Sequence, residues 1–246
     1  MQNFYTPPEH FTDTTVGLYG EEHHHATHSC RVRIGEVIGV TDGCGKHVFA
    51  RVESIDKTHL TAVIEHDVSG SGEPALAITL ALAVIKPARF ETAVEKCTEL
   101  GVRRIIPLAA NRCRPYGANR LNSKRLEKIA REAARQSGRS WVPEIAQSLT
   151  LTELLDDREC RFFAASQTAE RCFEDGFKDT ADSRPVTLLV GPEGDFSEDE
   201  YKEMTQCGVR MFSLGGLTLR TETAGIVSVA LAARISPETS GIQRKA

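Results

Sequence analysis

Two short apolar segments in the last quarter of the chain each end in a glycine-containing loop that leads into a helix pattern. Residues 186–190 read VTLLV and are followed by GPEGDF, while residues 209–214 read VRMFSL and are followed by GGLTLRTETA. The almost unbroken apolar run at 186–190 is typical of a strand covered on both faces. In an open α/β sheet, ligands bind where strands end and helices begin. The two loops therefore predict one shared binding site.

The loop at 191–196 predicts a close approach of the main chain to a ligand. Gly191 and Gly194 flank Pro192, which favours a tight turn. Ser197 and Glu200 have the spacing of a capping box, so we expect a helix to start there. No Lys or Ser/Thr stands at P-loop spacing, which argues against a phosphate cradle. An ordinary strand-to-helix turn remains an alternative interpretation.

These residues resemble the SPOUT superfamily of RNA methyltransferases. The similarity lies in LLVGPEGDFS at 188–197 and LGGLTLRTETA at 214–224, and it is strongest to the RsmE-type enzymes. Those enzymes methylate N3 of a uridine in the 16S ribosomal RNA of the bacterial small subunit. The resemblance implies an α/β fold, with a C-terminal trefoil-knotted SPOUT domain and a small N-terminal PUA-like β-barrel. It also implies S-adenosylmethionine as the donor, and a homodimer with its site at the subunit interface.

The remainder of the chain fits a division into two domains. Residues 36–41, 47–55 and 59–65 are strand-like, and SGSGEP at 69–74 is the best linker candidate. After this linker, strand and helix patterns alternate, which predicts a mainly parallel sheet covered by helices. For these two parts the resemblance implies a PUA-like RNA-binding domain at 1–70 and a methyltransferase domain at 71–246. The expected elements of the second domain are strands at 75–84, 104–109, 161–165, 186–190 and 209–214, and helices at 89–100, 123–136, 197–207 and 223–234.

The resemblance also assigns roles to residues of the two loops. An arginine guanidinium offers donors and no acceptor, so we expect Arg220 to stabilise negative charge on the uracil oxygens and not to act as the base. Glu193 and Glu222 are alternatives for orienting Arg220 or for accepting the N3 proton. Asp195 stands where relatives usually have a third glycine. The residues expected around the donor are Leu189, Val190, Gly191, Glu193, Gly194, Leu214, Gly215, Leu217, Leu219 and Thr223.

A basic segment stands out in an otherwise acidic chain. Residues 112–139 hold nine Lys/Arg and two acids, whereas the whole chain has a net charge of −4. Lys124, Lys128, Arg131 and Arg135 recur along one face of the expected helix, where a bound phosphate backbone would relieve their repulsion. A plain solvated face is the alternative. Together with positions that match the family pattern, the expected RNA-binding residues are Arg31, Lys86, Lys96, Arg112, Arg114, Lys128, Arg131, Arg135 and Arg139.

Other features limit the class of protein. The seven cysteines are scattered without a Cys-x-x-Cys pair, which favours reduced thiols in a cytosol. The histidines in HHHATH at 23–28 raise a metal hypothesis, but a solvated helix start is the alternative, and we expect no metal. No apolar run of about 18 residues is present, and the N-terminus lacks a signal-peptide pattern. We therefore expect a cytoplasmic protein without a membrane partner.

Three other functions stay open at this stage. The chain could be an RNA-binding module that has lost catalysis, in which the basic helix is kept and the donor pocket is broken. It could be an α/β enzyme that binds a nucleotide phosphate at Gly191–Gly194. It could also be a SPOUT methyltransferase that acts on another RNA site.

Overall fold

The computed structural model describes residues 1–113, 120–157, 159–173 and 184–235. The chain forms two compact units. One unit combines residues 1–73 with residues 130–142, and the other contains residues 74–129 and the described residues from 143 onward. A segment from the middle of the chain is therefore part of the N-terminal unit.

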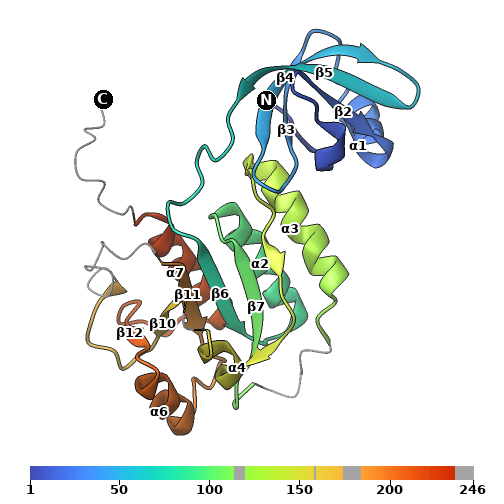
Figure 1. The fold of residues 1–246 in the computed structure, drawn as a ribbon. Helices are drawn as coiled ribbons and strands as arrows, with labels where there is room; N and C mark the ends of the chain where they lie inside the picture. The colour runs from blue at the N-terminus through green and yellow to red at the C-terminus, as the bar shows by residue number, and fades with distance from the viewer. Residues whose placement is uncertain (114–119, 158, 174–183, 236–246) are drawn as a thin grey trace, which may run out of the picture. The chain divides into compact units, whose positions relative to one another are not determined.

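The N-terminal unit is built on a curled sheet (Figure 1). Its strands run in the order β1-β3-β4-β5-β2, in which β1 and β3 are parallel and the other pairs are antiparallel. Alternate side chains point inward, so Leu18, Val40 and Leu60 are fully buried. The predicted small β domain is confirmed. The strands are β1 (Asn3–Tyr5), β2 (Thr15–Tyr19), β3 (Val37–Thr41), β4 (His47–Ile55) and β5 (His59–Asp67).

Sequence reasoning missed β1 and β2. β1 has only three residues and is followed by Pro7 and Pro8, which begin the short 3-10 helix η1 (Pro8–His10). β2 contains Gly17, where an added Cβ would lie 2.6 Å from Cε2 of Tyr19. The glycine therefore lets the Tyr19 ring lie back across the strand, a tertiary contact that strand propensity does not register.

The histidine-rich segment forms helix α1 (Gly20–His24), which continues as the π-helical turn η2 (His25–Ser29). His23 is buried, with its Nε2 atom 3.1 Å from the Asp56 carbonyl oxygen. The rings of His24 and His28 are stacked at 4.2 Å. The expected helix start is present, although it is less solvated than expected. No group of three metal-ligating side chains occurs among the described residues.

The second unit is an α/β structure around a parallel sheet. Its strand order is β12-β10-β11-β6-β7-β8, with β9 also paired to β7. The predicted parallel sheet covered by helices is confirmed in the described part of the chain. The strands are β6 (Ile78–Ala83), β7 (Arg104–Ala109), β8 (Glu144–Ile145), β9 (Leu149–Thr150), β10 (Arg161–Ala165), β11 (Val186–Val190) and β12 (Arg210–Phe212). The helices are α2 (Pro87–Glu99), α3 (Ser123–Ser137), α4 (Leu151–Leu155), α6 (Glu198–Gln206) and α7 (Thr221–Ala233).

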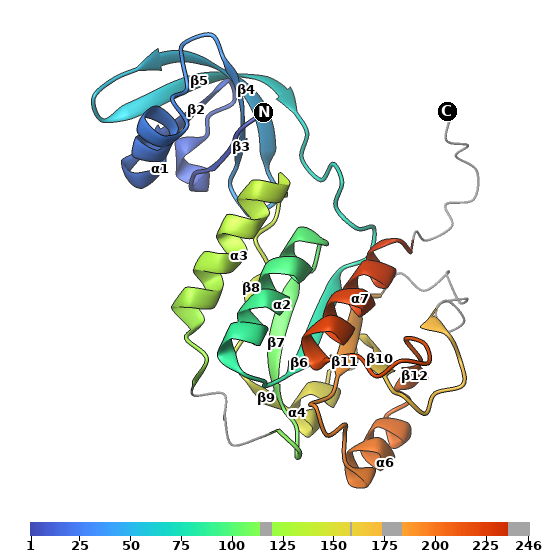
Figure 2. The same ribbon diagram turned by 180° about the vertical axis from the view of Figure 1, so that it is seen from behind.

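Helices cover both faces of this sheet. α2 and α7 pack on each other over one face, and α7 contacts β6 and β11 (Figure 2). A Cβ added at Gly225 would lie 3.1 Å from Leu82 Cδ1, so the small residues of α7 allow the helix to approach the sheet closely. On the other face, α4 and α6 bury Leu154 and Met204 in a core shared with Leu189 of β11 (Figure 1).

The predicted element boundaries agree with the structure to within a few residues, apart from two differences. β12 covers residues 210–212 instead of 209–214, because the chain turns away into the loop that carries Gly215. β8, β9 and α4 were not predicted, since two-residue strands and a five-residue helix are too short to show periodicity.

None of the helices in the described ranges has the length and apolar character needed to cross a bilayer.

Candidate active site

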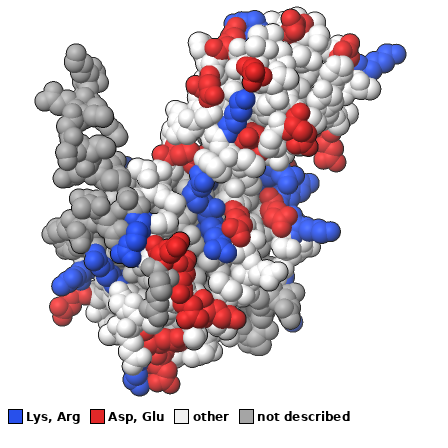
Figure 3. All heavy atoms as spheres, in the orientation of Figure 1, with Lys and Arg blue, Asp and Glu red and all other residues white. Residues whose placement is uncertain are grey.

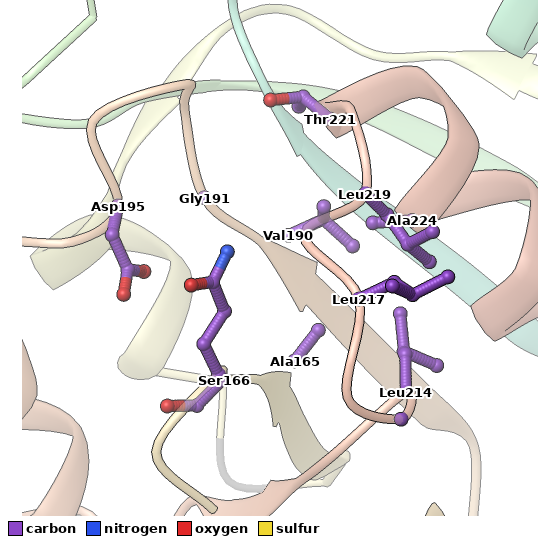
Figure 4. Close-up of a pocket in the computed structure, with 12 residues that line it drawn as sticks. Ala165, Ser166, Val190, Gly191, Asp195, Leu214, Leu217, Leu219, Thr221 and Ala224 are labelled. Carbon is purple, nitrogen blue, oxygen red and sulfur yellow. The ribbon is translucent and has the colours of Figure 1, made fainter.

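A groove opens where three neighbouring strands, β10, β11 and β12, end. Its volume is about 530 Å³, including the part that is open to solvent. Figure 4 shows Leu214, Leu217 and Ala224 on one side, with the oxygen atoms of Ser166 and Asp195 on the other. The groove is lined by Ala165, Ser166, Gln167, Val190, Gly191, Asp195, Leu214, Gly215, Leu217, Leu219, Thr221 and Ala224.

The two loops predicted to share one site do meet at this groove. Six of the residues expected around a donor line it: Val190, Gly191, Leu214, Gly215, Leu217 and Leu219. The other expected residues lie elsewhere. Leu189 is fully buried in the core, and Thr223 is half-buried in α7 outside the lining. Glu193 and Gly194 line a second pocket, which also contains Lys86 and Arg112.

Asp195 occupies a left-handed backbone conformation with φ of 61°. Among non-glycine residues, Asp and Asn tolerate this region best, which explains how an acid can stand at this turn of the loop. Its Oδ1 atom accepts hydrogen bonds from the Phe196 amide at 2.8 Å and from the Tyr201 hydroxyl at 2.8 Å. Burial, together with the carboxylate of Asp195, raises the pKa of Tyr201 to about 12. The Asp195 side chain therefore stabilises the turn of the loop.

The capping box predicted from Ser197 and Glu200 is present, and it does more than start α6. The Glu200 carboxylate accepts hydrogen bonds from the backbone amides of Ser197 at 2.7 Å and Asn111 at 2.8 Å, and the residue is only 4% exposed. Arg112 donates to the Gly194 and Phe196 carbonyls at 2.9 and 3.3 Å. The segment after β7 thus holds the loop after β11 in place.

Arg89, in the first turn of α2, links the two acids that were predicted to be catalytic. Its Nη1 atom lies 2.6 Å from Glu193 Oε1, and its Nε atom lies 3.6 Å from Glu222 Oε1. The Glu222 side chain is only 12% exposed, and its Oε2 atom is buried without a hydrogen-bond partner in the described structure. Arg89 therefore joins α2, the loop after β11 and the start of α7. Sequence reasoning missed it because the residues are more than a hundred positions apart.

Arg220 is the N-cap residue of α7, and its side chain is exposed. Its guanidinium forms no hydrogen bond or ion pair with the described residues. The expected pairing with Glu193 or Glu222 is therefore not seen within this chain, and both acids contact Arg89 instead. An exposed arginine beside the groove lining at Leu219 and Thr221 is positioned to meet a molecule that arrives from solvent.

Several of the expected RNA-binding cations are exposed. Lys86 and Lys128 lie on the surface, and Arg131 lies with its guanidinium 5.1 Å from the centre of the Tyr5 ring. Arg31 is exposed and has a φ of 55°, an unusual conformation for a residue with a side chain. Arg114 lies outside the described residues.

Three other expected cations have partners within the protein. Lys96 donates to Glu95 and Glu99 at 2.7 and 2.8 Å. Arg135 is half-buried, 2.9 Å from His25 Nε2. Arg139 is 6% exposed and donates to the Glu73 carboxylate at 2.7 Å.

Apart from Asp195, the groove residues missing from the expected donor site end or follow β10, or lie in the first turn of α7. Ala165, Ser166 and Gln167 belong to the groove because β10 lies beside β11 in the sheet, although about 20 residues separate them in the chain. Strand order is not readable from an alternating pattern. The available signal was that several strands end at the same edge of a parallel sheet.

The fold and groove describe an α/β enzyme with a ligand site at the carboxyl edge of its sheet, joined to a small β domain. The sequence matches the RNA methyltransferase domain model over residues 72–233 and the RNA methyltransferase PUA domain model over residues 18–65. The chain belongs to this RNA methyltransferase family, which confirms the resemblance found in the motifs.

Individual relatives cover most of the chain. The chain is 30% identical to ribosomal RNA small subunit methyltransferase E of Synechocystis sp., over 91% of this chain and 74% of that one. It is 26% identical to the enzyme of the same name from Rickettsia conorii, over 89% of both chains. A crystal structure of ribosomal RNA small subunit methyltransferase E from Neisseria gonorrhoeae, bound to S-adenosyl methionine, matches with a TM-score of 0.81 and 31% identity, over 94% of this chain and 96% of that one.

Proposed function

We propose that this protein transfers a methyl group from S-adenosylmethionine to N3 of a uridine in 16S ribosomal RNA of the small subunit. The observation that carries the proposal is the groove between the loops after β11 and β12, in a chain similar to an enzyme solved with that donor. The names of the two relatives given above state that they methylate small-subunit ribosomal RNA, which supports the substrate assignment.

The chemistry of the groove lining fits this donor. Asp195 is the charged residue among the lining residues that the structure describes, and none of these is Lys or Arg. A nucleotide phosphate would therefore find no positive partner among the described lining residues. S-adenosylmethionine is a sulfonium cation, so a carboxylate is compatible with it, and Leu214, Leu217 and Leu219 offer an apolar surface to its adenine ring. When bound, the donor supplies an electrophilic methyl group.

Protein groups around the methyl donor would then act on the uracil. We assign Arg220 to the negative charge that builds on the uracil oxygens as N3 loses its proton. Of the two acids, Glu193 is the proton acceptor that we propose, because its side chain is 43% exposed whereas that of Glu222 is 12% exposed. Glu222 would keep Arg89, and through it Glu193, at the site. Correct alignment of N3, methyl and sulfur would provide most of the remaining acceleration.

The RNA would be held by positive charge outside the groove. We assign this role to Arg31 in the domain at 1–70 and to Lys86, Lys128 and Arg131, which are exposed. Arg139 is left out of this set because it is buried against Glu73. Such an enzyme acts in the cytoplasm, where ribosomal RNA is made and assembled.

A homodimer and a trefoil knot are also part of the proposal. The small-residue face of α7 and the closeness of its first turn to both loops support them, because a knotted chain needs tight packing at this point. Mass measurement of the full chain in solution tests the dimer. A monomer at micromolar concentration would contradict this part of the proposal while leaving the donor assignment intact.

Calorimetry with S-adenosylmethionine, ATP and NAD tests the donor assignment. We expect S-adenosylmethionine to bind and the two phosphate-containing cofactors to bind much more weakly. Methylation of small subunits that lack the modification, followed by mapping of the modified base, tests the reaction. Binding of ATP in preference to S-adenosylmethionine would contradict the proposal, and donor binding without methyl transfer would indicate an inactive RNA-binding module.

Arg220→Lys separates a catalytic role of this residue from a structural one. The lysine keeps the charge but loses the planar fork, so we expect the single-turnover methylation rate to fall roughly 10²-fold. Melting temperature and donor affinity should stay unchanged, because the Arg220 side chain has no partner among the described residues. A stable variant with a near wild-type rate would remove Arg220 from the mechanism.

A further inference from the structure

A second pocket lies on the other side of the loop that lines the donor groove. The loop residues Pro192, Glu193 and Gly194 form one wall, and Val84 and Ile85, which follow β6, form part of the other. The volume of the pocket is about 610 Å³, including the part that is open to solvent, which is a little more than the volume of the groove. Because one loop separates the two cavities, a molecule in the second pocket would lie directly beside the donor site.

The charges of the two cavities are opposite. Among the described residues, the groove is lined by a carboxylate and no cation, whereas the second pocket is lined by two cations, Lys86 and Arg112. Glu193, the acid among the described residues that line the second pocket, is paired with Arg89 at 2.6 Å, which offsets its charge. The second pocket therefore favours an anion, which the groove does not.

Lys86 has the properties of a binding residue. It is exposed, it is the N-cap residue of the thirteen-residue helix α2, and it has no side-chain partner among the described residues. Lys96, ten residues further along, has both neighbouring acids as partners at 2.7 and 2.8 Å. The positive end of the α2 dipole adds to the field of Lys86 at the same place.

Arg112 differs from Lys86 because its position is fixed. Its Nη1 atom is held by the Gly194 and Phe196 carbonyls, so the guanidinium is ordered without any ligand. Those carbonyls are neutral, and the positive charge of Arg112 stays available to an anion in the pocket. The wall beside it is apolar, since Val84, Ile85 and Pro192 line the pocket with carbon atoms.

We propose that this second pocket binds one nucleotide of the substrate RNA, with its phosphate between Lys86 and Arg112 and its base and ribose against Val84, Ile85 and Pro192. An apolar wall with two cations at its edge is complementary to an aromatic ring that carries a phosphate. The inference deepens the proposed function and rests on it for the identity of the RNA. It does not require that the groove bind S-adenosylmethionine.

The test uses the full-length protein and three small probes: uridine 5′-monophosphate, uridine and inorganic phosphate. Saturation-transfer NMR detects binding even at millimolar affinity. We expect uridine 5′-monophosphate to bind more tightly than either part alone. Lys86→Gln should weaken its binding about tenfold, the size of one lost charge-assisted contact. Lys57→Gln, at an exposed lysine of the N-terminal unit, is the matched control and should have no effect.

Two further measurements keep this proposal separate from the proposed function. Donor affinity of Lys86→Gln by calorimetry should equal that of the wild type, since Lys86 does not line the groove. The slope of RNA affinity against salt should decrease by about one unit. If Lys86→Gln binds uridine 5′-monophosphate as tightly as Lys57→Gln does, the pocket is not a nucleotide site. Inorganic phosphate binding as tightly as the nucleotide would overturn the proposal too, because the apolar wall would then contribute nothing.

The outcomes of the two proposals can be told apart. Donor binding without nucleotide binding removes the second pocket and leaves the methyltransferase assignment standing. Nucleotide binding that is sensitive to Lys86, in a protein that binds no S-adenosylmethionine, would support the pocket and remove the donor assignment.

Discussion

At the scale of single residues, Asp195 has two separable functions. Its backbone conformation and hydrogen bonds shape the loop, and its charge lies in the groove lining. Asn has a similar tolerance for the left-handed region and keeps an Oδ1 acceptor, so Asp195→Asn isolates the charge. We expect a melting temperature close to that of the wild type and a several-fold loss of S-adenosylmethionine affinity, measured by calorimetry.

Asp195→Ala serves as the comparison for this prediction. It removes the acceptor for Phe196 and Tyr201 and places a residue without local hydrogen bonding at a φ of 61°. We expect a loss of about 1–3 kcal/mol in the free energy of unfolding. Equal donor affinity in the Asn variant and the wild type would show that the carboxylate charge does not contribute to binding.

Arg89 is the residue that the structure adds to the site. Arg89→Gln should lower the methylation rate, since Glu193 and Glu222 lose the guanidinium that links them across three segments. Rescue by Arg89→Lys should be partial, because an ammonium cannot reproduce the fork. The measurement is kcat and KM, with the pH profile of kcat as the readout that a purely structural role would not move.

Arg125→Gln, in α3, provides a control that removes a different ion pair to α2. Arg125 contacts Glu91 of α2 at 2.6 Å, but this pair lies away from the groove and is solvent-exposed on the arginine side. Exposed ion pairs contribute little to stability, so activity and melting temperature should stay near wild type. An equal loss of activity in the two variants would mean that Arg89 acts only by anchoring α2.

At the scale of elements, the basic residues of α3 divide into two groups. Lys128 and Arg131 are exposed, whereas Arg135 contacts His25, and Arg139, just beyond the helix, is buried with Glu73. The double substitution of Lys128 and Arg131 by Ala should reduce the slope of RNA affinity against salt by about two units, with no change in melting temperature. Filter binding across a salt series measures this.

Arg139→Ala should lower the melting temperature and leave the salt dependence of RNA affinity unchanged. Removing one partner of a buried pair leaves the Glu73 carboxylate without its guanidinium, which typically costs about 3–5 kcal/mol. We expect a large fall in melting temperature and no change in the salt slope of the protein that remains folded. A normal melting temperature together with weaker RNA binding would show that Arg139 contacts RNA after all.

At the scale of the whole molecule, the fold should lose stability at alkaline pH through Tyr201. The folded-state pKa of this hydroxyl is raised to about 12 by burial and by Asp195, above its ordinary value of 10.0. A raised pKa stabilises the fold below the unfolded value, and the contribution is lost as the pH rises from 10 to 12. Urea unfolding at pH 8 and pH 11 should show this loss, and Tyr201→Phe should reduce it. An unchanged pH dependence in Tyr201→Phe would contradict the assignment.

The sequence by itself determined the local structure and the family. The strand at 186–190, the capping box at Ser197 and Glu200, and the main helices were predictable because each depends on neighbouring residues along the chain. The two glycine loops indicated a shared site because parallel strands bring their carboxyl ends to one edge. The motifs at 188–197 and 214–224 indicated the family because each is a short contiguous stretch that can be recognised in the sequence.

Only the tertiary structure decided which side chains meet. Strand order brings Ser166 beside Gly191, and it places Arg89 against Glu193, 104 residues away in the chain. Burial decided that Arg139 pairs with Glu73, although in the sequence it looks like the other basic residues of its segment. Periodicity describes a chain one element at a time. Ion pairs, burial and cavity walls depend on distances between elements, which the packing inside each unit sets.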